Sequence, residues 1–371
     1  MKAGIARYGS RVVAGLALAI FCVGWAYAHK LATRSSPEER QLSKITTGYG
    51  AEMERLLARW SISVFTEPVH EEITNRIYGC DGDGSVCAGE NALTATPAVL
   101  AGVRWNDDPP FRLGLDQARG TNCKTGDTVR FETQPSCWVT LFRAANKGAA
   151  SGREYGPGDA MLYRTHFGDL QFLHSMASRD GETAAVTKAR MMGWFEFTWR
   201  AAAGEYTLET RLKDIDNPTI RAAFGRSDWR MQDLYTQGAG NGLRRQLHDV
   251  AFGSLLHTVQ DSFAAGHVDR EESSGMQRCA AGPVVVKAPG AVVSFHAYNH
   301  QDHAQHAAAD SRVAFMRQLQ QDGDVVEVGR ALLDARERKL DWPTVQPLLE
   351  CLFVLRQPDA PAGPGDFVAA R

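Results

Sequence analysis

The sequence predicts an all-α protein, folded as a single multi-helix domain with disulfide-pinned loop insertions. Apolar side chains recur at spacings of three and four over 159–203 and 242–266, which is the period of a helix with one buried face. Only the segment 283–293 has the character of a strand. With 371 residues and 44% hydrophobic content, the chain can bury one large core, and no internal repeat divides it.

The first 28 residues have the pattern of a secretory signal peptide. Three basic residues precede an apolar run over 12–25, and Ala26-Tyr27-Ala28 follows as a cleavage signal of small residues. The run is shorter than the roughly 20 residues that a membrane-spanning helix needs, although an uncleaved anchor stays an alternative. We expect a secreted or periplasmic protein, anchored to the membrane if this helix is retained.

The mature chain divides into three further segments. Residues 29–60 are expected to form an N-terminal helical segment, with breaks at Gly48 and Gly50. The main folded domain is expected over 61–356. The tail, 357–371, is rich in Pro, Gly and Ala and is expected to be disordered.

Within the domain, Thr66-Glu67-Pro68 is typical of a first helical turn and predicts a helix that carries His70. Helical periodicity returns over 159–203, and the longest predicted helix covers 242–266. The stretches 79–89 and 114–158 are rich in Gly, Asp, Asn and Ser and are expected to be loops held by cysteines.

Six cysteines remain after the signal peptide, an even number that agrees with export. Neighbours in the sequence suggest the pairs Cys80–Cys87 and Cys123–Cys137, which leaves Cys279 for Cys351, among about fifteen possible connectivities. We therefore predict three disulfides with these partners.

The sharpest chemical signal is a set of histidines and aspartates at helical spacing. His257 and Asp261 are four residues apart, so they share one helix face, and His267 follows directly after Gly266, where the helix can end. His306 and Asp310 repeat the spacing. Nitrogen and oxygen donors in this mixture favour zinc.

The pattern H-x3-D-x5-H followed by H-x3-D resembles the ligand signature of zinc-dependent phospholipases C and of the related fungal single-strand nucleases. The segments Trp105-Asn106-Asp107 and His166-Phe167-Gly168-Asp169 resemble two further ligand segments of this superfamily, and His70 resembles its early histidine. The residues 256–263 are more similar to those of the bacterial phosphatidylcholine-hydrolysing phospholipases C than to those of the nucleases.

The resemblance implies two or three zinc ions. The first would be held by Asp107, His166, His257 and Asp261, the second by His267, His306 and Asp310, and the third by His70 with a bridging Asp261. In the family, the amino group of an N-terminal tryptophan completes the third site, whereas cleavage after Ala28 leaves His29, far upstream of His70. Exposure of Trp60 by further processing, a carboxylate of Glu67, Glu71 or Glu72, or a site with only two ions are the alternatives.

Several neighbouring residues compete for these roles or support them. Asp108 competes with Asp107 as a ligand, and Asp169 could orient the imidazole of His166. Three histidines, His296, His300 and His303, lie close to His306 in the sequence, but only His306 has a carboxylate four residues on. These three, with His174 and His248, are expected to be surface histidines.

The implied function is a zinc-dependent phosphoric diester hydrolase, in which metal-bound hydroxide attacks phosphorus and Asp107 orients or deprotonates the water. The preferred substrate is a phosphatidylcholine-like lipid, cleaved to diacylglycerol and a phosphorylated head group, with Trp105 or Phe167 as a wall for choline. The enzyme is expected to be a monomer that can contact a membrane surface.

Two other functions stay open. One is an exported single-strand nuclease or nucleotidase, which would need stacking aromatic side chains beside the metals. The other is a zinc-stabilised exported protein without turnover. The formal net charge of −2 gives no basic field for a polyanion and disfavours binding of duplex nucleic acid.

Overall fold

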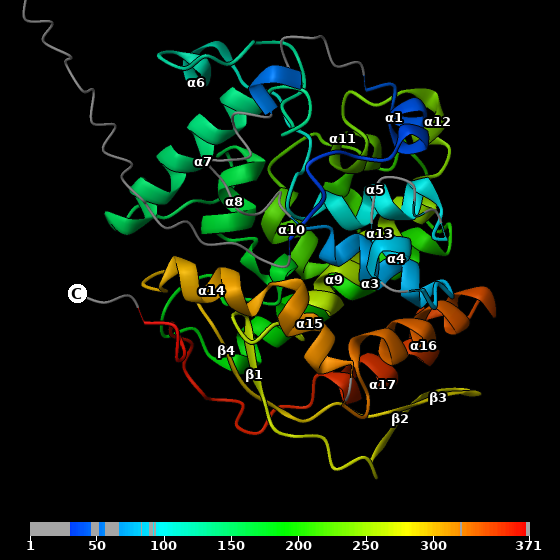
Figure 1. Ribbon diagram of the computed structural model, residues 1–371. Coiled ribbons are helices and arrows are strands. Elements are labelled where there is room, and N and C mark those ends of the chain that lie inside the picture. Colours follow the sequence, from blue (N-terminus) through cyan, green and yellow to red (C-terminus); the bar gives the residue numbers. More distant parts are fainter. Residues whose placement is uncertain are drawn as a thin grey trace, which may run out of the picture.

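The computed structural model describes residues 30–45, 52–55, 67–82, 84–88, 92, 94–319 and 321–368. The protein is mostly helical, with a few short strands, in agreement with the predicted class (Figure 1). The predicted signal peptide and Trp60 lie outside the described residues.

The core is built around three helices, α5 (Pro97–Trp105), α9 (Ala184–Ala202) and α13 (Leu247–Asp261). Two glycines allow α5 and α13 to pack closely. A Cβ atom added at Gly102 would lie 2.1 Å from the carbonyl oxygen of Val250, and one at Gly253 would lie 2.2 Å from that of Val99. Larger side chains would force these helices apart, so the two glycines bring the residues at the end of α5 onto α13.

Shorter elements surround this core. Several begin with Pro in the first turn or with a side-chain cap, such as Thr96 for α5, Asn217 for α10 and Asp341 for α17. The remaining helices are α1 (Pro37–Ser43), α3 (Val69–Ile77), α4 (Gly84–Cys87), α6 (Leu115–Ala118), α7 (Pro135–Ala150), α8 (Met161–Phe167), η2 (Gln171–His174), η3 (Leu212–Asp214), α10 (Pro218–Phe224), α11 (Met231–Tyr235), α12 (Asn241–Arg244), α14 (His303–Ala309), α15 (Arg312–Gln318), α16 (Val325–Glu337) and α17 (Trp342–Leu352).

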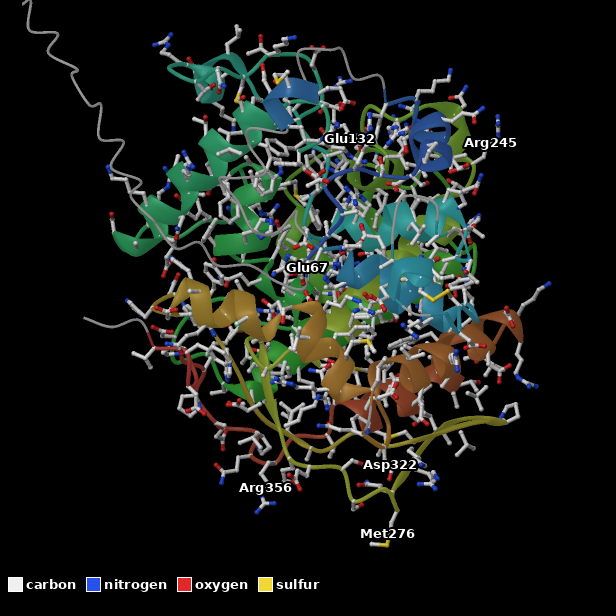
Figure 2. The ribbon with its side chains drawn as sticks, viewed as in Figure 1. Glu67, Glu132, Arg245, Met276, Asp322 and Arg356 are labelled. Carbon is white, nitrogen blue, oxygen red and sulfur yellow. A yellow bond between two sulfur atoms is a disulfide. The ribbon has the colours of Figure 1, made fainter. Side chains whose placement is uncertain are left out.

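The described strands form two antiparallel pairs. β1 (Val268–Arg270) pairs with β4 (Val292–Phe295), and β2 (Arg278–Ala281) pairs with β3 (Val284–Lys287). The strand expected over 283–293 is thus two strands, each paired with a partner that precedes it. Met276, just before β2, is 83% exposed and projects at the lower edge of the view in Figure 2.

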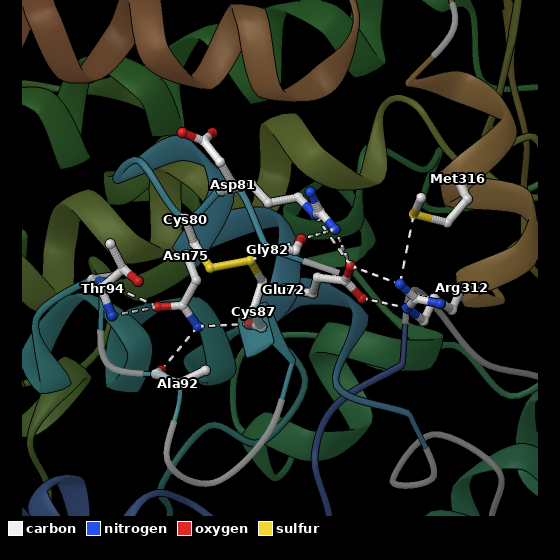
Figure 3. Close-up of a disulfide and its surroundings, with 12 residues drawn as sticks. Glu72, Asn75, Cys80, Asp81, Gly82, Cys87, Ala92, Thr94, Arg312 and Met316 are labelled. Carbon is white, nitrogen blue, oxygen red and sulfur yellow. Dashed lines mark hydrogen bonds and ion pairs between the residues drawn. A yellow bond between two sulfur atoms is a disulfide. The ribbon is translucent and has the colours of Figure 1, made fainter. Parts of the chain in front are cut away.

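All three predicted disulfides are present. Cys80 is bonded to Cys87 beside α3 (Figure 3). Cys123–Cys137 lies in the segment between Asp108 and His166, here called the insertion, and ties its first part to α7. Cys279–Cys351 joins β2 to α17, across 72 residues of sequence. Three disulfides fit an extracellular or periplasmic protein. None of the helices in the described part of the chain has the length and apolarity needed to span a bilayer.

Three segments differ from the sequence-based expectations. The expected loop over 114–158 contains the 16-residue helix α7, whose buried aromatic residues Trp138 and Phe142 pack on the core. The predicted helix over 242–266 is broken between α12 and α13. Of the segment expected to be helical over 29–60, α1 and residues 52–55 are helical in the described part.

The C-terminal tail is ordered up to residue 368, although its composition suggested disorder. The backbone amide of Ala362 donates to the carbonyl of Glu182 at 2.8 Å, and the amide of Ala297 donates to the carbonyl of Gly363 at 2.8 Å. The extended tail therefore supplies backbone hydrogen bonds to two loops of the core, which composition alone does not reveal.

Candidate metal centre

The site lies where α3, α5, α13 and the short helix η2 meet. Asn106, directly after α5, joins three of these elements. Its side-chain nitrogen donates to the carbonyl of Leu173 at 2.8 Å, and its oxygen accepts from the hydroxyl of Ser254 on α13 at 2.7 Å. Asn106 is fully buried, so these bonds hold the neighbouring Asp107 against α13 and η2.

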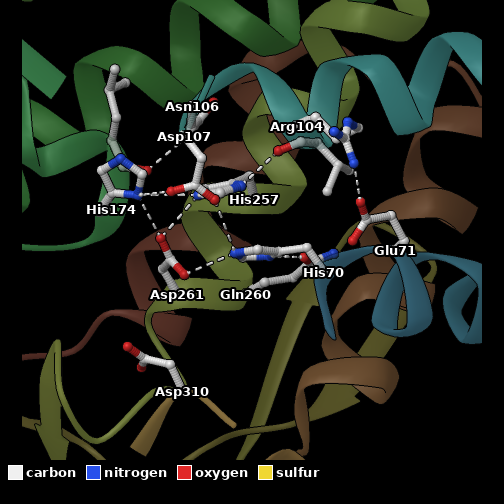
Figure 4. Close-up of polar contacts among 12 residues, drawn as sticks. His70, Glu71, Arg104, Asn106, Asp107, His174, His257, Gln260, Asp261 and Asp310 are labelled. Carbon is white, nitrogen blue, oxygen red and sulfur yellow. Dashed lines mark hydrogen bonds and ion pairs between the residues drawn. The ribbon is translucent and has the colours of Figure 1, made fainter. Parts of the chain in front are cut away.

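Four side chains form the first group (Figure 4). Nε2 of His257 lies 3.0 Å from Oδ2 of Asp261, one helical turn further on. Nδ1 of His174 lies 2.9 Å from that same oxygen and 3.7 Å from Oδ1 of Asp107. Donors around a tetrahedral zinc with bonds of about 2.05 Å are separated by about 3.3 Å. The donor atoms of Asp107, His174 and His257 lie near enough to one another to hold one ion, and Asp261 lies directly beside two of them.

His70 joins the cluster from α3. Its Nε2 lies 3.3 Å from Oδ1 of Asp261 and 3.9 Å from Oδ2 of Asp107, and its ring stacks on His257 with centroids 3.9 Å apart. Because the other oxygen of Asp261 faces His257 and His174, this carboxylate is placed to bridge two ions.

The second group consists of His267, His306 and Asp310. Nε2 of His306 lies 3.0 Å from Oδ2 of Asp310, and Nε2 of His267 lies 3.7 Å from Oδ1. The two imidazole rings stack with centroids 5.0 Å apart. A Cβ atom at Gly266 would lie 2.8 Å from Nδ1 of His306, so glycine is required there for His306 to reach the site.

The hydrogen bonds of the histidines show which nitrogen faces the cluster. Nδ1 of His257 contacts the carbonyl of Val103 at 2.7 Å, and Nδ1 of His267 contacts the carbonyl of His174 at 2.6 Å. A carbonyl oxygen only accepts, so each Nδ1 carries the hydrogen. In the neutral ring, the lone pair on Nε2 then points at the carboxylates. This arrangement is typical of histidines that bind a metal through Nε2.

The burial of the carboxylates supports the same conclusion. Asp107 and Asp310 are fully buried, and the side-chain oxygens of Asp107 accept no hydrogen bond from the described residues. Burial raises the pKa of Asp107 to about 7. Although burial opposes it, the carboxylates of Asp261 and Asp310 raise the pKa of His267 to about 9. A buried cluster of carboxylates needs cations, which protons on the histidines or metal ions can supply.

Side chains from position 70 to position 310 thus converge, as the sequence analysis expected. Three groups could hold a metal ion in the described part of the chain: His70, His257 and Asp261; Asp107, His174 and His257; and His267, His306 and Asp310. All of these residues are buried.

His174 was not among the predicted ligands. It was expected at the surface, but it is 3% exposed and contacts Asp261 directly. His166, expected as the ligand, lies outside the three groups. Its Nε2 donates to the backbone carbonyl of Asp107 at 2.8 Å, and its ring stacks on His174. Burial lowers the pKa of His166 to about 3. The apolar neighbours Phe172, Leu173 and Met176 were a signal that His174 is buried.

Two nearby carboxylates serve other partners. Oδ1 of Asp108 accepts the backbone amide of Phe131 at 2.9 Å, so its carboxylate holds the insertion rather than facing the cluster. Asp169 forms two hydrogen bonds with the guanidinium of Arg164, at 2.7 and 2.8 Å, and not with His166. Of the two adjacent aspartates, the structure brings Asp107 to the site.

The three alternative histidines near α14 lie outside the metal-binding groups of the described residues. His296 is buried, contrary to the expected surface position, and its Nε2 lies 2.8 Å from the carboxylate of Asp269. His300 is exposed and pairs with Asp180 at 2.8 Å. His303 is partly exposed and is the first residue of α14, three positions before His306.

The start of the described chain lies beside His70. The carbonyl of Lys30 accepts the backbone amides of Val69 at 2.8 Å and of His70 at 3.3 Å. Position 29 was expected to be remote because it is far upstream in the sequence. In the structure, the neighbouring residue Lys30 lies beside the beginning of α3.

The glutamates considered as substitute donors all have cationic partners. Glu71 pairs with Arg104 at 2.6 Å, and Glu72 pairs with Arg312 at 2.6 Å (Figure 3). Glu67 pairs with Lys30 at 3.2 Å. These ion pairs neutralise the three carboxylates, and Oε2 of Glu71 is the buried oxygen among them that accepts no hydrogen bond from the described residues.

Comparison with protein-family models, with curated proteins and with solved structures finds no match to this chain.

Proposed function

We propose that the protein is an exported zinc-dependent phosphoric diester hydrolase with the phospholipase C and zinc nuclease type of fold. The observation that carries the proposal is the cluster of three buried histidine and aspartate groups, in which His257 belongs to two groups and Asp261 can bridge. Adjacent cation sites of this kind suit phosphoryl transfer, because charge on the attacking and leaving oxygens is neutralised together.

The donor set fits zinc. It contains imidazole nitrogens and carboxylate oxygens without thiolates, because all six cysteines of the predicted mature chain are in disulfides. Zinc bound there would lower the pKa of a coordinated water towards neutrality and would stabilise the charge on the phosphate.

The residues of the chain have distinct roles in this proposal. Asp107 has two buried oxygens without hydrogen bonds from the described residues, so one can bind the metal while the other orients a water and accepts its proton. The carbonyls of Val103 and His174 hold the rings of His257 and His267 in the tautomer that binds through Nε2. The interior excludes bulk water, which strengthens these interactions.

A phospholipid is the proposed substrate, supported by the resemblance of 256–263 to phosphatidylcholine-hydrolysing enzymes. The structure does not support Trp105 or Phe167 as a wall for the choline group. Trp105 is 1% exposed, donates to the carbonyl of Leu234 and stacks on Trp194, so it belongs to the core and does not form a wall for choline. Phe167 is likewise buried, against Phe142 and Tyr298.

The test measures metal content and turnover together. The purified protein should contain two or three zinc ions and release a phosphorylated head group from phosphatidylcholine vesicles. Asp107→Asn should abolish turnover and leave the chain folded. Asp108→Asn is the matched control, since the amide oxygen still accepts the Phe131 amide and activity should persist.

Other results would replace the proposal. Cleavage of single-stranded DNA with inert lipids would identify a nuclease instead. Bound zinc without hydrolysis of either substrate, together with a lower melting temperature for Asp107→Asn, would identify a structural metal site.

A further inference from the structure

A cavity lies beside α8, and Met161 and Arg164 of this helix line it. It has a volume of about 360 Å³ and is lined by residues of α8, α10 and the segments that contain Phe111 and Trp229. Arg164 on α8 donates to the carbonyl of Ala223 on α10 at 2.8 Å, which links the two helices. The volume lies within the range of about 300–1,000 Å³ that is typical of small-molecule sites.

The walls of this cavity are apolar and aromatic. Phe111, Met161 and Phe224 are 2–3% exposed, so they form a fixed inner wall. Trp229 stacks on Phe224 with ring centroids 6.0 Å apart and planes inclined by 23°, and it stays partly exposed. A flat ring that enters the cavity can therefore stack beside Trp229.

The rim of the cavity is cationic. Arg112 and Arg226 both line it, both are exposed, and neither forms an ion pair with any described residue. The acid at the rim, Asp159, is already engaged by Arg153 at 3.0 Å and by the backbone amide of Gly156 at 3.0 Å. Two guanidinium groups are thus available to an anion, in a protein whose net charge is −2.

We propose that this cavity is a binding site for a small organic anion built on a flat ring, with the ring beside Trp229 and the anionic group on Arg112 and Arg226. None of the residues of the three metal-binding groups lines the cavity. The proposal is therefore independent of the hydrolysis proposed above, and its ligand need not be a phosphate ester.

The test uses three probes on the purified full-length protein. 2-Naphthalenesulfonate carries both a ring and an anion, 2-naphthol carries only the ring, and methanesulfonate carries only the anion. Calorimetric titration should show binding of the first at one site and at least about tenfold weaker binding of the other two. A sulfonate is not hydrolysed, so turnover at the metal cluster does not affect the result.

Variants then locate the site. The double variant Arg112→Gln and Arg226→Gln, and separately Trp229→Ala, should each weaken binding by about tenfold. Trp229→Phe keeps a ring and should retain most of the affinity. Arg221→Gln is the matched control, because Arg221 lies on α10, pairs with Asp216 and does not line the cavity.

Unchanged affinity in the double arginine variant would overturn the proposal. These side chains are exposed, so that variant should fold normally, and its melting temperature checks this directly. Equal binding of 2-naphthol would show that the cavity recognises only apolar rings, which also contradicts the proposal.

Discussion

Replacing His174 with alanine should remove one metal ion, whereas replacing His166 with alanine should not. Both imidazoles lie beside Asp107, and their rings stack with centroids 5.2 Å apart. Only His174 directs a nitrogen at the carboxylates, 2.9 Å from Asp261 and 3.7 Å from Asp107. His166 instead donates to the backbone carbonyl of Asp107.

The expected magnitudes follow from these contacts. Four-ligand zinc sites bind with about 10–16 kcal/mol, so the loss of one ligand costs about 3 kcal/mol, or about 100-fold in affinity. The loss of the His166 hydrogen bond costs about 1 kcal/mol, which would weaken zinc affinity by about fivefold at most. His174→Ala also removes the imidazole that contacts the buried carboxylate of Asp261.

The assay is zinc content by mass spectrometry after dialysis against graded chelator concentrations. His174→Ala should lose one equivalent at chelator concentrations that leave the wild-type protein and His166→Ala fully loaded. The reasoning is refuted if His166→Ala loses the ion while His174→Ala keeps it, because His166 would then be the ligand.

Three further predictions concern other parts of the structure. Gly266→Ala should release an ion of the second group, because the added Cβ lies 2.8 Å from Nδ1 of His306, whereas Gly363→Ala, with no atom within 4 Å, should keep full zinc content. Removing the Cys279–Cys351 disulfide, which spans 72 residues, should lower the free energy of unfolding by about 4 kcal/mol, as measured by urea denaturation; a loss below about 1 kcal/mol contradicts this. Burial raises the pKa of Glu39 from 4.5 to about 7, so its stabilising contribution is complete below pH 4.5 and is lost as the pH rises to 7. Glu39→Gln stays neutral, so its unfolding free energy relative to wild type should increase across that interval, and a pH-independent difference would count against a buried neutral carboxyl.

Local spacing made part of the site predictable. His257 and Asp261 lie one turn apart on a helix, so their shared face follows from the period of 3.6 residues alone. The same holds for His306 and Asp310. Gly266 indicated that the helix ends directly before His267. The disulfides were predictable because two of them join neighbours in the sequence and the third joins the remaining pair.

The choice between His166 and His174 could not be made locally. α8 ends at Phe167, and the chain then turns into η2. Asn106 donates to the carbonyl of Leu173 in η2, and Ser175 donates to the carbonyl of Thr258 on α13. These contacts join residues that are more than 60 positions apart. As a result, His174 contacts the carboxylates of Asp107 and Asp261, whereas the ring of His166 stacks on that of His174.

The sequence by itself therefore determined the helical class, the covalent links and the pairs of candidate ligands that share one helix face, since these depend on residues a few positions apart or on a small set of cysteines. Only the tertiary structure decided that His174 joins the cluster, that Trp105 is core, that residue 30 lies beside His70 and that the tail is ordered. Those outcomes depend on packing and hydrogen bonds between distant segments, and helical periodicity carries no information about them.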